Sequence, residues 1–247
     1  MKRIRIVGLC LVAVFAMAAV AASAAQAAPT YFTCVKAAKE GKTYTGKYTA
    51  KGCTNASKVE TGGKYERASA VGVTMKSKSG TATLSTPDLG GKVVCSKSKG
   101  TGKVTGASTD EQLVEFEKCT SEGKKCTSSG AKAGDIVTKP LATELVGSES
   151  APEDRFTAIG GSGNYQAEFD CEGLLIRTKG FTDGLITSPA AGTASKSSTV
   201  TFEGEENLRT EVSIDGGAEW IGSEFGGFPS EEKVTASVKN SAELGTT

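Results

Sequence analysis

The stretch of sequence that decides the fold is QLVEFEKCTSEGKKC, residues 112–126. It is an apolar segment that runs into a tight loop with a cysteine at each end. Val114 and Phe116 alternate with acidic residues, which is typical of a strand with one buried face. Thr109 and Gln112 would instead form a capping box at the start of a helix. We favour the strand, with Val114 and Phe116 pointing inward.

The same period of two recurs through the rest of the chain. Apolar and polar side chains alternate in residues 71–76, 93–95, 165–171, 199–203, 211–215 and 233–238. No segment shows sustained helical spacing, apart from a single helical turn that we expect at residues 150–153. Turns are predicted at residues 100–102, 160–164, 183–184 and 215–217, the last as a hairpin.

This pattern predicts an all-β fold in one domain. About a dozen short strands would form either a two-sheet sandwich or a flattened barrel, held by three disulfides. A chain of this length can bury a core large enough for a single domain. Residues 28–65 are rich in Lys and Gly and have little apolar material, so we expect them to be a disulfide-stapled lead-in to the domain.

Residues 1–27 have the organisation of a secretory signal peptide. A basic start with Lys2, Arg3 and Arg5 is followed by an apolar run and by the small-x-small site at residues 25–27. A retained membrane anchor is the alternative, because the apolar run is long. We expect cleavage after Ala27, which would leave residues 28–247 as a secreted or cell-envelope domain without a membrane span.

Six cysteines remain once Cys10 leaves with the leader. In an exported chain they are expected to be oxidised, and six cysteines allow about 15 pairings. Cys34 and Cys53 would staple the lead-in. Strand phase directs Cys95 and Cys171 into the core from mid-strand, so we expect a bridge between two packed sheets. Cys119 and Cys126 would then close the local loop.

Several short motifs give the chain a resemblance to known proteins. They are YFTCVK at 31–36, GKY at 46–48 with Cys53, GGKY at 62–65, GKKC at 123–126 and GAKAGDI at 130–136. In these motifs, which cover about half of the mature chain, the sequence resembles a group of exported actinobacterial proteins. The group has no assigned activity. The resemblance therefore implies export and a shared fold, and it assigns no functional residue.

The chain contains no histidine. This excludes Ser-His-Asp and Cys-His nucleophile systems and every His-ligated metal site. Paired cysteines would leave no thiolate for catalysis or for zinc. Gly41-Lys42-Thr43 resembles the end of a phosphate-binding loop but lacks the leading glycine. We therefore expect a protein that is not an enzyme, with no catalytic, cofactor-binding or metal site.

One enzymatic alternative needs no histidine. Two opposed carboxylates on a β-sandwich can hydrolyse glycosides, which would make the protein a carbohydrate-active hydrolase. The candidates are the acids that alternate along one strand or cluster beyond another: Glu168, Asp170, Glu172, Glu203, Glu205 and Glu206. We favour the simpler interpretation that these acids form solvated strand faces.

The charge is distributed unevenly along the mature chain. Residues 28–107 carry 14 basic and 4 acidic side chains, whereas residues 108–247 carry 12 basic and 24 acidic ones. Lys97, Lys99 and Lys103 recur at strand spacing, which suggests contact with an anionic envelope polymer. Alternatively, the basic and acidic portions face each other in the fold, or the lysines protect edge strands from pairing.

These observations favour a non-catalytic binding or structural protein. Its partner would be an anionic envelope polymer or another surface protein. Nucleic acid is not an expected partner, because aromatic side chains that could stack on bases are missing among the lysines. No cofactor is expected.

Overall fold

The computed structural model describes residues 28–87, 90–161, 164–203, 210–215 and 228–247, with the backbone alone at 210–215 and 228–229. The predicted signal peptide and most of the predicted hairpin turn at 215–217 lie outside these residues. The described chain is all-β, and its one helical element is a 3-10 turn, Asn55–Ser57. None of its described segments is a helix with the length and apolarity needed to cross a membrane.

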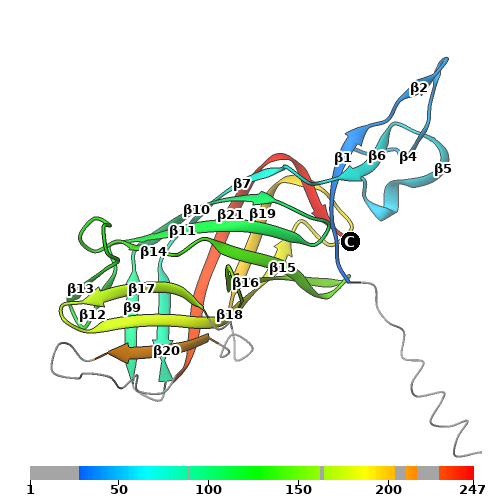
Figure 1. Ribbon diagram of the computed structural model, residues 1–247. Coiled ribbons are helices and arrows are strands. Elements are labelled where there is room, and N and C mark those ends of the chain that lie inside the picture. The colour runs from blue at the N-terminus through cyan, green and yellow to red at the C-terminus, as the bar shows by residue number, and fades with distance from the viewer. Residues whose placement is uncertain (1–27, 88–89, 162–163, 204–209, 216–227) are drawn as a thin grey trace, which may run out of the picture.

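Eight antiparallel strands close into a ring, which we call the proximal ring (Figure 1). Each strand pairs with the next around the ring, and the last pairs with the first. In order, they are β7 (Thr74–Ser79), β10 (Lys97–Val104), β11 (Thr109–Glu117), β15 (Leu141–Ser148), β16 (Ala151–Ala158), β18 (Leu175–Ser188), β19 (Ser195–Phe202) and β21 (Phe228–Thr246). Closure leaves this part of the sheet without a free edge.

A second ring, the distal ring, continues from the first. Strands β18 and β21 are 14 and 19 residues long and run through both rings. The remaining members are β8 (Ala82–Thr86), β9 (Gly91–Cys95), β12 (Thr120–Ser121), β13 (Lys124–Thr127), β17 (Tyr165–Cys171) and β20 (Thr210–Asp215). Their pairings also close. With β14 (Ile136–Val137) paired to β11, the rings form one long barrel.

Residues 31–69 form a projection at the proximal end of the barrel, beside the C-terminus (Figure 1). Its strands are β1 (Tyr31–Lys36), β2 (Lys39–Glu40), β3 (Thr43–Tyr44), β4 (Gly46–Tyr48), β5 (Lys58–Gly63) and β6 (Tyr65–Ser69). Strand β1 pairs with β6 and with the end of β21, which ties the projection to the barrel. Most of residues 28–65, which were expected to be a lead-in, lie in this projection.

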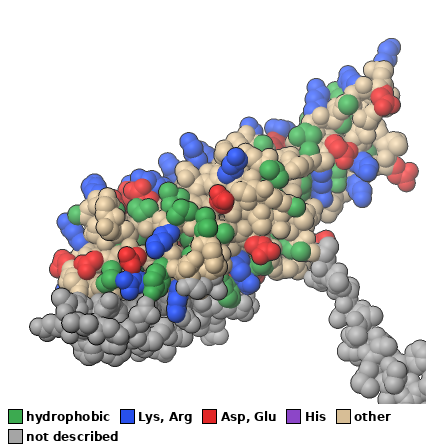
Figure 2. Space-filling view, in the orientation of Figure 1, with side chains coloured by type: hydrophobic (Ala, Val, Ile, Leu, Met, Phe, Trp, Pro, Cys, Tyr) green, Lys and Arg blue, Asp and Glu red, His purple; other side chains and the backbone are tan. Residues whose placement is uncertain are grey.

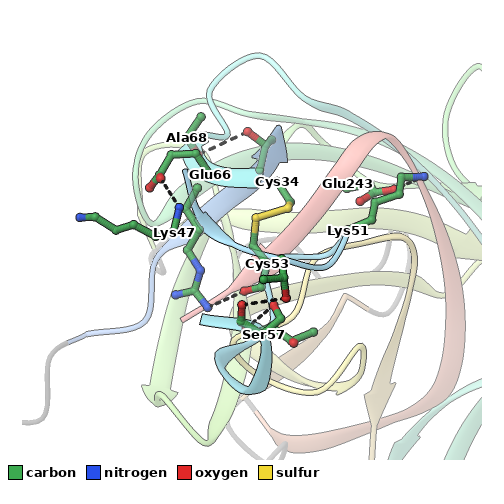
Figure 3. The surroundings of a disulfide bond; sticks show 12 residues. Cys34, Lys47, Lys51, Cys53, Ser57, Glu66, Ala68 and Glu243 are labelled. Atoms are coloured by element: carbon green, nitrogen blue, oxygen red, sulfur yellow. Dashed lines mark hydrogen bonds and ion pairs between the residues drawn. A yellow bond between two sulfur atoms is a disulfide. The ribbon is translucent and has the colours of Figure 1, made fainter. Parts of the chain in front are cut away.

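A single arginine organises the interior of the projection. The guanidinium of Arg67 lies between the rings of Phe32 and Tyr48, 4.1 and 5.0 Å from their centroids. It also donates hydrogen bonds to the carbonyls of Cys53 and Gly192. Figure 3 shows the adjoining Cys34–Cys53 disulfide, which confirms the predicted pairing. Cation–π contacts and the disulfide together compensate for a very small apolar core.

The other two predicted disulfides are wrong. The structure pairs Cys95 with Cys119 and Cys126 with Cys171, in place of Cys95–Cys171 and Cys119–Cys126. These cysteines lie in or directly beside four neighbouring strands, β9, β12, β13 and β17. The Cys126 amide donates to the Cys119 carbonyl at 3.0 Å, but each side chain bonds to the strand on its other side. The prediction assumed two facing sheets, whereas a closed ring places β9 and β17 three strands apart.

Strand β11 is confirmed, with Val114 and Phe116 packed against the core. Two predicted turns are wrong, because residues 100–102 lie within β10 and residues 183–184 within β18. The expected helical turn at 150–153 is also wrong, since strand β16 begins there. At Gly184, a Cβ would lie 2.7 Å from the ring of Phe202. A glycine is therefore required within this strand, because the neighbouring side chain leaves no room for a Cβ. In the sequence, such a glycine is easily mistaken for a turn residue.

Candidate functional site

A cavity of about 170 Å³ occupies the barrel interior and extends through both rings. Its wall is mostly apolar, with side chains that include Val93, Phe116, Phe156, Phe169 and Val200. The strand alternation places these side chains inward, and closure of the rings brings them to a common interior. Small apolar molecules are the ligands that such walls suit best.

The proximal end of the cavity is filled by a buried polar cluster. The Tyr31 hydroxyl donates to Asp110 Oδ2 at 2.7 Å and to Asp154 Oδ1 at 3.4 Å. Gln112 Nε2 donates to Asp154 Oδ2 at 3.2 Å. Tyr31 is held in place by its own amide, which donates to the Ala107 carbonyl at 2.7 Å. The first residue of β1 therefore closes this end of the barrel.

Burial changes the acidity of this cluster. It raises the pKa of Asp154 well above the ordinary value, and the charge of Asp110 acts in the same direction. Burial raises the pKa of Asp110 as well, and it raises that of the Tyr31 phenol, where both carboxyls add to the effect. Two carboxyls that share one phenol donor in a buried site favour protonated forms, because two adjacent negative charges would repel each other.

Glu232 is the cavity's second acidic feature, and it lies in the distal ring. It occupies β21 between the inward residues Ser230 and Val234, opposite Leu84 of β8. Burial alone raises the pKa of this carboxyl to about 7. No hydrogen-bond donor or cation from the described residues accompanies it, whereas Lys233, on the outer face, pairs with Glu203 at 2.8 Å.

Sequence reasoning missed these residues although a signal was present. The alternation of Val234, Ala236 and Val238, followed two residues back, places Glu232 on the inward face. The inward series of Phe116 and Val114 likewise reaches Asp110. An acid in phase with a buried apolar series was the available clue. The spacing of residues along the sequence could not show that Tyr31 and Asp154 lie next to Asp110.

The acids named as a possible hydrolytic pair lie elsewhere. Glu168 Oε2 pairs with Arg177 Nε at 2.6 Å, and Asp170 Oδ1 accepts a hydrogen bond from the Gly173 amide at 2.9 Å. Glu172 and Glu203 contact the Lys125 amide and the Lys233 side chain. Glu205 and Glu206 lie outside the described residues. The four described acids make local contacts on the outer face, and none of them lines the cavity.

The three lysines named as a polymer contact lie on β10, and two of them are paired. Lys97 Nζ lies 2.8 Å from Glu117, and Lys99 Nζ lies 3.1 Å from both Glu115 and Glu117. Lys103 is exposed opposite Glu111. The basic strand β10 thus runs beside the acidic strand β11, so the alternative in which basic and acidic portions face each other is confirmed here.

A second group of lysines stands on the projection, where Figure 2 shows several Lys and Arg side chains. Lys36 and Lys39 lie 5.9 and 4.7 Å from the centroid of the Tyr44 ring. Desolvation acts to raise the pKa of the Tyr44 phenol, but the charges of Lys36, Lys39 and Lys64 outweigh it and lower the pKa. This convergence makes the projection a local centre of positive potential.

Comparisons with protein-family models, with curated proteins and with solved structures find no match for this chain. The features that bear on function are therefore the barrel interior and the charged surfaces.

Proposed function

We propose that this is an exported, non-catalytic binding protein that holds a small apolar molecule inside its barrel. The observation that carries the proposal is the cavity of about 170 Å³ with its mostly apolar wall. An apolar protein cavity of about 150 Å³ is large enough to bind benzene. The ligand would therefore be the size of one aromatic ring or of a short alkyl chain.

The construction of the barrel supports this proposal. Both rings close, and Cys95–Cys119 and Cys126–Cys171 link four neighbouring strands of the distal wall. A closed wall with two disulfide links keeps its shape in the absence of ligand. Binding then costs little conformational entropy, which favours affinity for a small molecule.

The location outside the cytoplasm is supported by three features. The three disulfides are typical of oxidising compartments. Residues 1–27 have the features of a secretory leader. The resemblance to exported actinobacterial proteins points the same way.

The test uses the purified, oxidised protein and thermal unfolding in the presence of toluene, indole or hexanol. A ligand at ten times its Kd should stabilise the folded protein by about 1.4 kcal/mol. Ala236→Leu places extra side-chain volume in the cavity and should abolish the effect. Ser237→Leu, on the exposed face of the same strand, should preserve it. If none of the three compounds stabilises the wild type, the proposal is wrong.

A second candidate function is adhesion to an anionic envelope polymer. The specific observation is the convergence of Lys36, Lys39 and Lys64 on Tyr44, since Lys97 and Lys99 are engaged by glutamates. The projection would then replace β10 as the contact surface. A salt-sensitive interaction with a polyanion, lost when the three projection lysines become Gln, would support it.

The hydrolase alternative has a weaker basis. Asp110 and Asp154 are brought together, but Tyr31 covers them and both are buried. A carboxylate pair in a glycosidase must face its substrate. Turnover of a polysaccharide that disappears in Asp154→Asn would favour the hydrolase over the binding protein.

A further inference from the structure

Glu232 is a half-buried acid on the cavity wall that the fold does not explain. Its carboxyl lines the cavity and has neither a hydrogen-bond donor nor a cation from the described part of the chain. An ionised carboxyl is unfavourable in apolar surroundings, so a structural role would be served better by Gln or Leu. An ionisable group in a cavity with a perturbed environment is a candidate for ligand recognition.

We propose that the internal ligand is a small apolar amine whose ammonium group pairs with the carboxylate of Glu232. This inference rests on the proposed function, and it adds the chemical class of the ligand. The hydrocarbon part would lie against the apolar wall, where Leu84, Val93 and Phe169 line the same cavity. The cavity volume of about 170 Å³ suits an amine with six to eight heavy atoms, roughly the size range of benzene and its close derivatives.

The surroundings of Glu232 show why a cation is the complementary group. The neighbours on β8 are Thr83, Leu84 and Ser85, which carry no charge. On its own strand, Glu231 and Lys233 alternate to the outer face. The other ionisable groups in the cavity wall are Tyr31 and Asp154, which bond to each other at the proximal end. β20 pairs with β21 and is described by its backbone alone.

The chemistry discriminates among ligands of equal size. An ammonium group supplies both the countercharge and the hydrogen-bond donors that the carboxylate lacks, so pairing offsets the cost of burial. An alcohol supplies one neutral hydrogen bond. A carboxylic acid in its ionised form would place a second negative charge in the cavity and be repelled. An amine should therefore bind tighter than an alcohol of the same length, and an acid weakest.

The experiment is a calorimetric titration of the oxidised protein with hexylamine, hexanol and hexanoate at pH 8. The wild type should bind hexylamine most tightly. Glu232→Gln keeps the side-chain shape and removes the charge, and it should weaken hexylamine binding by about tenfold or more while leaving hexanol within about twofold. Glu231→Gln is the matched control on the outer face and should leave all three affinities unchanged.

A second readout is the pH dependence of binding. Lowering the pH from 8 to 5.5 protonates Glu232, so hexylamine should bind about tenfold or more weakly while hexanol binding stays constant. The amine itself remains protonated throughout this range. A merely structural Glu232 would not separate the two ligands in this way.

The outcomes separate this inference from the function on which it rests. If hexanol binds as tightly as hexylamine, or if Glu232→Gln changes both equally, the amine assignment is overturned while the barrel remains a ligand-binding site. If hexylamine, hexanol and hexanoate all fail to bind, the proposed function fails and the amine assignment fails with it.

Discussion

Acidic side chains occur at both ends of the barrel interior, but their surroundings differ. At the proximal end, Asp110 and Asp154 receive hydrogen bonds from Tyr31 and Gln112. In the distal ring, Glu232 faces the cavity without a partner among the described residues. In the first arrangement, the fold itself supplies the hydrogen-bond partners of the acids. The second leaves an interaction to be completed, which is what a binding site requires.

The surface repeats this contrast. The lysines of β10 lie against the glutamates of β11, so that strand pair neutralises itself. On the projection, Lys36 and Lys39 converge on Tyr44 instead. Lys51 and Glu243 form an ion pair at 2.7 Å where the projection meets the barrel (Figure 3). The lysines of β10 are thus held in ion pairs within the fold, whereas Lys36 and Lys39 contact an aromatic ring.

The largest effect should come from the disulfides. Replacing Cys126 and Cys171 by Ala removes a link across 45 residues and should destabilise the protein by about 4 kcal/mol. Replacing Cys34 and Cys53, which are 19 residues apart, should cost about 3 kcal/mol. Denaturant unfolding measures both. Of these two changes, only the first should also weaken hexanol binding, because Cys126–Cys171 lies in the barrel wall and Cys34–Cys53 lies in the projection.

The next effect concerns the unpartnered acid. The folded protein holds the Glu232 proton up to a pH of about 7, whereas the unfolded chain releases it near the model value of 4.5. The folded state therefore loses stability as the pH rises from about 4.5 through 7. Glu232→Gln should stabilise the protein by about 3 kcal/mol at pH 8 and leave it nearly unchanged at pH 4.

Urea unfolding at the two pH values measures this difference. Glu231→Gln, on the outer face of β21, is the control and should show little change at either pH. An equal change for Glu232→Gln at pH 4 and pH 8 would show that the carboxyl is not perturbed by burial.

Loss of a hydrogen-bond donor to the proximal acids should destabilise the protein, which is the opposite of the effect expected for Glu232→Gln at pH 8. Tyr31→Phe removes the hydrogen-bond donor to Asp110 and should destabilise the protein by about 2 kcal/mol, because a buried carboxyl loses its partner. Tyr44→Phe removes a hydroxyl from the exposed side of the projection and should have almost no effect. Midpoints of denaturant unfolding compare the two. Equal midpoints would mean that the proximal cluster contributes nothing to stability.

The smallest effect is expected at the surface. Changing Lys36, Lys39 and Lys64 to Gln should lower the salt concentration that elutes the protein from a polyanion column, because no ion pair with the described residues engages these lysines. Changing Lys97 and Lys99 to Gln should shift elution less and cost at most about 1 kcal/mol of stability, as is typical of exposed ion pairs. A larger shift for the variant with changed Lys97 and Lys99 would show that β10, and not the projection, is the surface that contacts the polyanion.

Much of this architecture could be predicted locally. Alternation identified the strands that contain Val114, Phe169 and Val234, and these three side chains point inward as predicted. Short-range closure identified Cys34–Cys53. The missing histidine excluded whole classes of catalysis without any structure. Each of these inferences needs only neighbouring residues or the composition.

Tertiary structure alone decided the neighbours. Alternation with a period of two shows which face of a strand is buried, but it does not show which strand lies beside it. Closure into rings placed Cys119 beside Cys95, brought Tyr31 to Asp110 across 79 positions, and put Gly184 against Phe202. The sequence by itself determined the sheet and its faces. The shared interior, with one acid cluster hydrogen-bonded and Glu232 unpartnered among the described residues, exists only because distant strands meet.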